Sequence, residues 1–124
     1  MAEVVPIVGM RVVSTVAALD AARWPDSAIV LRLAPDEAFC IGADEVSISD
    51  PHAIALRDGG VVGAWVSDPD RVLAPLLEWP LPVERPALVS GALGGLGARI
   101  WVDHDRALVL VAAPYATELV ERLP

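Results

Sequence analysis

Two acid and imidazole groupings are the residues of this chain that could bind a metal ion. The first is Asp103-His104-Asp105, and the second is formed by Asp50 and His52. Adjacent residues at a hairpin tip point in different directions, and no second His or Cys lies near the first group to complete a site. The two groups would meet only if folding brought them together. We therefore expect both segments to be solvated turns and expect no metal site.

Glycines, a cysteine and acidic pairs are the other features that could do chemistry. Residues 91–97 hold four glycines, but a strand pattern follows them and the chain has no Lys, so a hairpin turn is favoured over a phosphate-binding loop. Cys40 lies in an apolar run with no adjacent base, which predicts an inert, buried thiol. The acidic pairs at residues 36–37 and 44–45 diverge in space as sequence neighbours do, so we expect them to be solvated. None of these features predicts a catalytic residue.

The composition is both acidic and apolar. The 124 residues include nine Lys plus Arg and 17 Asp plus Glu, for a net charge of −8, and 55% are hydrophobic. A mean hydropathy of +0.53 excludes a disordered chain. The acidity disfavours binding to nucleic-acid phosphates, and the longest uncharged stretch, residues 86–98, is shorter than the ~20 residues of a membrane-spanning helix. We expect a globular protein with neither a nucleic-acid nor a membrane partner.

The length and the residue types that are missing bear on organisation and location. A chain of this size can bury roughly two thirds of its unfolded surface around one core, so a single domain over residues 1–124 is expected. Cys40 is the only cysteine, and the first residues lack a secretory signal, which favours the cytoplasm. The absence of Lys, Asn and Gln removes groups that bind polar small molecules. The apolar excess instead indicates a surface that associates with another protein or with a second copy.

Apolar periodicity predicts an α+β fold. Residues 1–13 are expected to be an extended or loosely packed N-terminal segment. The pattern then predicts the following elements: a helix over 14–23, a hairpin over 28–41, a second hairpin over 53–66 that turns at Asp58-Gly59-Gly60, a helix that begins at Asp68-Pro69 and ends at Trp79-Pro80, strands at 87–92, 98–102 and 107–111, and a helix over 115–123. The expected arrangement is a mostly antiparallel sheet with two or three helices packed on one side, with ferredoxin-like elements.

The tryptophans are the candidate interface residues. Trp79 continues a helical stripe and is predicted to lie in the core. Trp101 shares a strand face with Arg99, opposite the apolar face, so we expect an outward tryptophan of the kind that anchors interfaces, unless a helix of this chain covers it. Trp65 is ambiguous because both faces of its strand are apolar. We therefore predict an interface of Trp101, Trp65 and Arg99.

Two segments carry a family resemblance. Residues 30–39, Val-Leu-Arg-Leu-Ala-Pro-Asp-Glu-Ala-Phe, resemble a strand, turn and strand of the sarcosine oxidase gamma subunit and of the related aminomethyltransferase-like folate-binding proteins. Residues 109–116, Val-Leu-Val-Ala-Ala-Pro-Tyr-Ala, are similar to the entry of that family's last helix. The resemblance covers about residues 28–123. It departs from the family at Asp68-Pro69-Asp70, where a glycine is usual, and no residue matches a folate ligand.

The resemblance implies aminomethyltransferase-like elements in the fold and an accessory role, because the gamma subunit is mainly a structural partner in a flavin-bearing assembly. We expect a non-catalytic subunit, without a cofactor of its own, that associates with a partner protein in a flavin- or folate-linked amine oxidase assembly. The alternative is a folate-type small-molecule binding protein or enzyme.

Overall fold

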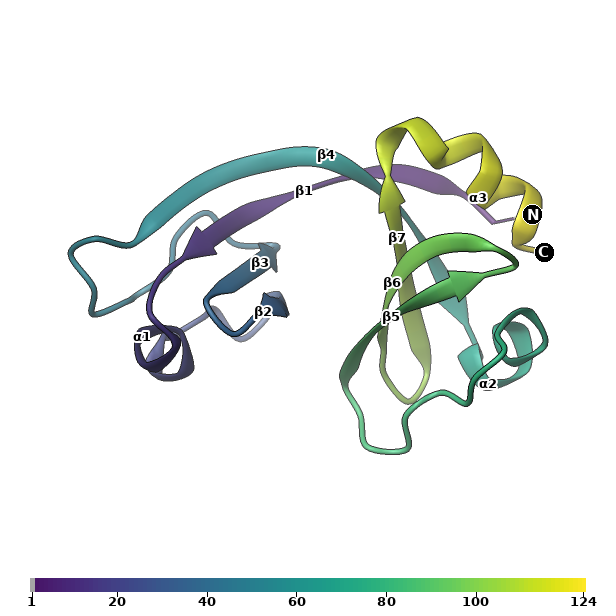
Figure 1. Ribbon diagram of the computed structural model, residues 1–124, viewed down its shortest axis with the longest axis horizontal. Helices are drawn as coiled ribbons and strands as arrows, with labels where there is room; N and C mark the ends of the chain where they lie inside the picture. Colours follow the sequence, from purple (N-terminus) through teal and green to yellow (C-terminus); the bar gives the residue numbers. More distant parts are fainter. Residues whose placement is uncertain (1) are drawn as a thin grey trace. The chain divides into compact units, whose positions relative to one another are not determined.

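The computed structural model describes residues 2–124. Its strands are β1 (Val4–Val13), β2 (Ile29–Ala34), β3 (Glu37–Ile41), β4 (Ile54–Ser67), β5 (Ala87–Leu93), β6 (Leu96–Val102) and β7 (Arg106–Ala112). Its α-helices are α1 (Val16–Ala21), α2 (Pro69–Val72) and α3 (Ala116–Arg122), and its 3-10 turns are η1 (Ala74–Leu76) and η2 (Ala113–Tyr115) (Figure 1). No helix in residues 2–124 is long and apolar enough to span a membrane.

The strands have the order β2-β3-β1-β4-β7-β6-β5, and neighbours such as β1 and β3, β4 and β7, and β5 and β6 are antiparallel. The expected α+β fold with a mostly antiparallel sheet is therefore confirmed. The chain divides into two compact units, one of Met1–Pro6 with Gly60–Pro124 and one of Ile7–Gly59. Strands β1 and β4 each contribute residues to both units.

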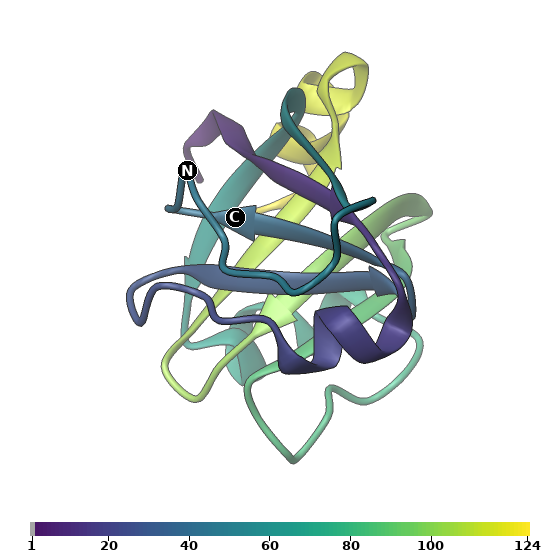
Figure 2. The same ribbon diagram turned by 90° about the vertical axis from the view of Figure 1, so that its left-hand side faces the viewer.

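In the Ile7–Gly59 unit, β2 and β3 form the predicted first hairpin, and β3 also pairs with β1. The predicted helix after residue 13 is also present as α1 (Figure 2), and the Thr15 hydroxyl caps it by accepting from the Ala18 N–H at 3.2 Å. Leu19 of α1 is 2% exposed and packs against Val12 of β1. Residues 4–13, expected to be extended or loosely packed, thus form a strand with a fully buried side chain.

In the other unit, one face of β4, β5, β6 and β7 forms the core. The predicted alternation of β6 is confirmed, because Ala98, Ile100 and Val102 belong to this core. Residues 107–111 of β7 are buried on both faces, as a central strand between β4 and β6 requires. Helical segments supply further core side chains: Leu73 after α2, Leu119 of α3 and Leu123 after it.

The predicted second hairpin over residues 53–66 is wrong. Strand β4 runs without a turn from Ile54 to Ser67, straight through Asp58-Gly59-Gly60. A tight hairpin turn needs positive φ angles, and neither Gly59 nor Gly60 has one. The predicted turn at Gly94 and Gly95 does have positive φ values of 55° and 84°, and it joins β5 to β6.

The start of α2 is predicted correctly in position but not in chemistry. Pro69 is the first helical residue, as expected. Asp68, however, adopts a left-handed conformation with φ of 52°, and its side chain makes no cap hydrogen bond. Its carboxylate instead accepts from Nε of Arg71 at 2.8 Å. The predicted extent of this helix, up to Trp79-Pro80, is wrong: α2 ends after four residues, and the 3-10 turn η1, which contains Pro75, follows it.

Candidate functional site

The interface residues predicted from the sequence share one face of the strands in the Gly60–Pro124 part of the chain. Trp65 of β4 lies opposite Leu108 of β7, Leu108 lies opposite Trp101 of β6, and Trp101 lies opposite Leu88 of β5. Residues directly opposite in antiparallel strands point to the same face. This face, opposite the core, is called the tryptophan face here. It also carries Arg99, two residues before Trp101.

The two tryptophans are in direct contact. Their ring centroids are 6.1 Å apart and the planes cross at 88°, an edge-to-face arrangement. The guanidinium of Arg106, at the start of β7, lies 4.4 Å from the Trp65 ring centroid and 5.6 Å from that of Trp101. A cation so close to an indole face is attracted by the negative charge on that face. Trp65, Trp101 and Arg106 therefore form one cation–π cluster.

The outward tryptophan is Trp65 and not Trp101. Trp65 is 41% exposed, whereas Trp101 is only 9% exposed, so the expectation of an exposed Trp101 is wrong. Alternation along β6 correctly places Trp101 on the face opposite Ile100, but alternation does not say what covers that face. Trp101 lies between two leucine neighbours in its row and beneath Arg106. Its part in the cluster is to support Trp65 and Arg106.

The arginines of the tryptophan face differ from most arginines of this acidic chain. Neither exposed Arg99 nor exposed Arg106 forms an ion pair with any carboxylate in residues 2–124. Within the described residues, five of the nine arginines do form one: Arg11, Arg32, Arg57, Arg71 and Arg85. The tryptophan face thus combines aromatic surface with unneutralised positive charge.

Arg106 was not recognised from the sequence. It lies between the predicted turn Asp103-His104-Asp105 and the predicted strand over 107–111, and neither prediction included it. The signal that identifies it is its spacing of two from Leu108, which places both on one strand face once β7 is known to begin at residue 106.

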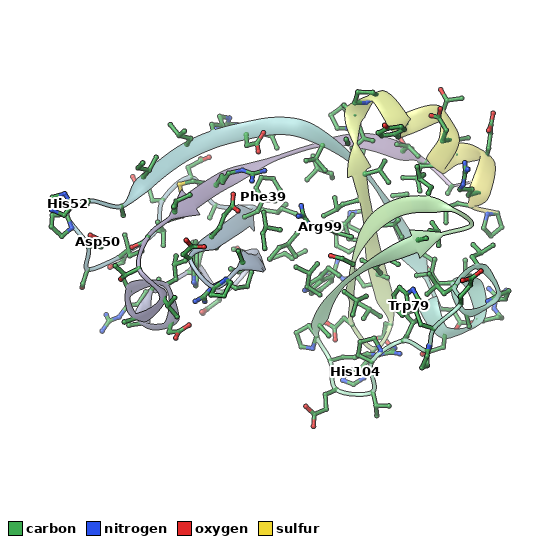
Figure 3. The ribbon with its side chains drawn as sticks, viewed as in Figure 1. Phe39, Asp50, His52, Trp79, Arg99 and His104 are labelled. Carbon is green, nitrogen blue, oxygen red and sulfur yellow. The ribbon has the colours of Figure 1, made fainter. Side chains whose placement is uncertain are left out.

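Each of the two acid and imidazole groupings makes hydrogen bonds within its own turn. Asp103 accepts from the main-chain N–H of His104 at 2.8 Å, and Asp50 accepts from that of His52 at 2.9 Å. Figure 3 labels Asp50 and His52, which lie next to each other in their turn. Ser14 also donates to Asp50, and these hydrogen bonds lower the pKa of that carboxyl. Among residues 2–124, no three His, Cys, Asp or Glu side chains lie close enough together to hold a metal ion.

The glycine cluster and the cysteine have structural roles. A Cβ at Gly91 would lie 2.7 Å from the ring of Trp79, so this glycine leaves room for the tryptophan that packs on the core. Cys40 is fully buried in β3, and burial raises the pKa of its thiol, as expected of an inert cysteine.

A cavity of about 440 Å³ lies in the Ile7–Gly59 unit. Its lining comes from β1, from the segment after β3 and from β4: Val8, Gly9, Met10, Gly42, Ala43, Asp44, Ala55 and Arg57. Most of these side chains are small or apolar, and the charged ones are Asp44 and Arg57, whose nearest atoms are 3.3 Å apart. The acidic pair at residues 44–45 therefore contributes the Asp44 carboxylate to the lining of this cavity.

Comparison with known proteins identifies no family model, no curated protein and no solved structure that matches this chain.

Proposed function

We propose that this protein is a non-catalytic accessory subunit that binds a partner protein through the tryptophan face. The observation that carries the proposal is the position of Trp65. It is 41% exposed, it is held in one orientation by Trp101, and it is covered on one side by Arg106. Trp and Arg are the residues most enriched among those that dominate binding energy at protein interfaces.

The charge of the tryptophan face supports a protein partner with acidic residues near its binding surface. Arg106 and Arg99 have no carboxylate partner in residues 2–124, while the whole chain has a net charge of −8. A carboxylate from a partner would pair with a guanidinium that is already oriented by the indole rings. Pre-orientation lowers the conformational entropy lost on binding.

The finer proposal is that the chain is a distant relative of the sarcosine oxidase gamma subunit, with aminomethyltransferase-like elements and helices on one side of its sheet. It is supported by two segments. Residues 34–37 form the turn of the β2–β3 hairpin, and residues 113–116 lead from β7 into α3. The partner would then belong to a flavin- or folate-linked amine oxidase assembly.

The experiment compares Trp65→Ala with Tyr115→Ala. The tagged chain is used to isolate its complex from the native source, and native mass spectrometry and the flavin absorption spectrum identify the partner. We expect a stoichiometric flavoprotein complex with wild type and with Tyr115→Ala, and at least about tenfold weaker binding with Trp65→Ala. Tyr115 is a suitable control because it is an aromatic residue of similar exposure, 50%, in η2.

A monodisperse monomer that recovers no such complex would contradict the accessory role. Thermal shift with tetrahydrofolate derivatives and flavins tests the alternative, since a ligand that binds only the folded state must raise its stability. Stabilisation by a folate without any protein partner would replace the accessory role by folate binding.

A further inference from the structure

Strand β4 extends beyond its pairing with β7. Its pairing with β7 runs from Val61, opposite Ala112, to Ser67, opposite Arg106. In residues 2–124, no strand pairs with residues 54–57 on the side away from β1. In Figure 1, β4 continues beside β1 over this stretch. The N-terminal part of β4 is thus a sheet edge whose main-chain groups are available to another strand.

This edge is exposed and apolar. Ile54 is 55% exposed and Leu56 is 63% exposed, and both point to the same face of the strand because they are two residues apart. Natural proteins usually protect such edges with charges, proline or a covering segment, because an open apolar edge pairs with other strands. Residues 54–57 carry one charge, Arg57. An exposed, apolar edge with a single charge is typical of an edge that pairs with another strand.

The opposite face of the same edge opens into the 440 Å³ cavity. Ala55 and Arg57 line it, together with Val8 and Met10 of β1. The small side chain of Ala55 leaves space beside the edge, and Arg57 provides a positive charge there. A strand added to β4 would therefore meet apolar side chains on one face and a cavity with a cation on the other.

We propose that residues 54–57 of β4 bind an extended segment of a partner protein by β-strand addition. The segment pairs antiparallel with β4 and carries apolar side chains opposite Ile54 and Leu56, a small side chain opposite Ala55 and an Asp or Glu opposite Arg57. Main-chain hydrogen bonds supply affinity in this mode, and the alternate side chains supply specificity. This site uses none of the residues of the tryptophan face and stands independently of the proposed function.

The positive charge of Arg57 favours an Asp or Glu at the position of the partner segment that lies opposite it. Arg57 and Asp44 form an ion pair at 3.3 Å, but their side chains are 76% and 88% exposed. An ion pair this exposed adds little stability, so exchanging Asp44 for a carboxylate of the partner costs little. In the strand pairing, that carboxylate would be held directly across from Arg57.

A partner protein fits this edge better than a second copy of the chain does. In a two-fold antiparallel pairing that places Ile54 opposite Leu56 of the second copy, Arg57 lies opposite Ala53 and gains no carboxylate. Two copies that each carry a net charge of −8 also repel each other. The second copy is therefore an outcome for the experiment to exclude.

The test uses a labelled peptide, Ser-Thr-Glu-Val-Ala-Ile-Thr-Ser, and a matched peptide in which Lys replaces Glu. Fluorescence anisotropy measures binding to the full chain. We expect the Glu peptide to bind wild type, Arg57→Glu to weaken this binding at least about tenfold, and Arg57→Glu to prefer the Lys peptide. Leu56→Asp should weaken binding of both peptides. The infrared amide I band of a ¹³C-labelled peptide should shift to the β position on binding.

Two exposed residues outside the edge serve as controls. Arg71→Glu changes another ion-paired arginine, whose side chain is 74% exposed, and Val83→Asp changes an apolar residue that is 91% exposed. Both should bind the Glu peptide as wild type does. The proposal is overturned if the Glu peptide shows no saturable binding at millimolar chain concentration, or if Arg57→Glu and Leu56→Asp leave its affinity unchanged. A wild-type dimer in light scattering that Leu56→Asp dissociates would also overturn it, by assigning the edge to a second copy.

Discussion

At the scale of single residues, Arg85 shows how one arginine side chain holds an irregular segment in place. Its side chain is 8% exposed and donates to both carboxylate oxygens of Asp70, at 2.9 and 2.6 Å. It also donates to the main-chain oxygens of Pro82 at 2.9 Å and Asp103 at 3.2 Å. Residues 81–86 have no helix or strand, so this arginine fixes them to α2 and to the β6–β7 turn.

The pairing with Arg85 predicts a pH dependence of stability. The hydrogen bonds from Arg85 lower the pKa of Asp70 below its ordinary value of 3.8. A carboxyl with a lower pKa in the folded state stabilises that state above its unfolded pKa, and the stabilisation is lost as the pH falls through the folded pKa. We therefore expect the free energy of unfolding to fall more steeply from about pH 4 to pH 2 in wild type than in Asp70→Asn.

Urea denaturation at stepped pH measures these slopes. Asp36→Asn is the control, because Asp36 is exposed and its side chain has no hydrogen bond or ion pair within residues 2–124. It should keep the wild-type slope. If Asp70→Asn also keeps that slope, the contact between Asp70 and Arg85 does not persist in solution.

At the scale of elements, two glycines distinguish a continuous β4 from a hairpin. A Cβ at Gly59 would lie 3.5 Å from Val8, an ordinary contact, and the φ of Gly59 is not positive. A Cβ at Gly95 would meet nothing within 4 Å, but this residue has a φ of +84°. We expect Gly59→Ala to raise the free energy of unfolding by about 0.5 kcal/mol, and Gly95→Ala to lower it by about 1 kcal/mol.

Chemical denaturation measures the free energy of unfolding of the two variants. Neither added methyl group clashes, so any difference between the variants reports on the backbone conformation at the two glycines. Equal destabilisation by both substitutions would mean that Gly59 occupies a turn in solution, and the long β4 would be wrong.

The elements that could be predicted are those whose pattern and turn residues agree. The β2–β3 hairpin, the β5–β6 turn at Gly94-Gly95 and the doubly buried β7 were all visible in the sequence. β4 was not, because Asp-Gly-Gly permits a turn without requiring one, and the deciding φ angles depend on the strands on either side. The predicted exposure of Trp101 was wrong for a related reason, because alternation assigns a side chain to one face of a strand but cannot say what covers that face.

At the scale of the whole molecule, the sequence could not show that β1 and β4 are neighbours. About 40 residues separate the end of β1 from the start of β4, and their pairing depends on how the hairpin between them folds back. Both strands contribute to both compact units, so neither unit is one continuous segment of chain. The single domain expected from the length therefore requires that the two units, which share β1 and β4, unfold together.

The shared strands predict that the two units unfold together. Leu19 is 2% exposed in the core of the Ile7–Gly59 unit, and its truncation to Ala is expected to cost about 2–5 kcal/mol. In a Trp24→Phe background, the remaining tryptophans, Trp65, Trp79 and Trp101, all belong to the other unit, so their fluorescence reports on that unit alone. We expect Leu19→Ala to lower the urea midpoint of this fluorescence transition, because loosening β1 and β4 in one unit removes neighbours from the other.

Val16→Ala, at a 47% exposed position of the same helix, should leave the midpoint unchanged. A biphasic circular dichroism transition with an unshifted fluorescence midpoint in Leu19→Ala would instead make the two units independent domains that share two strands.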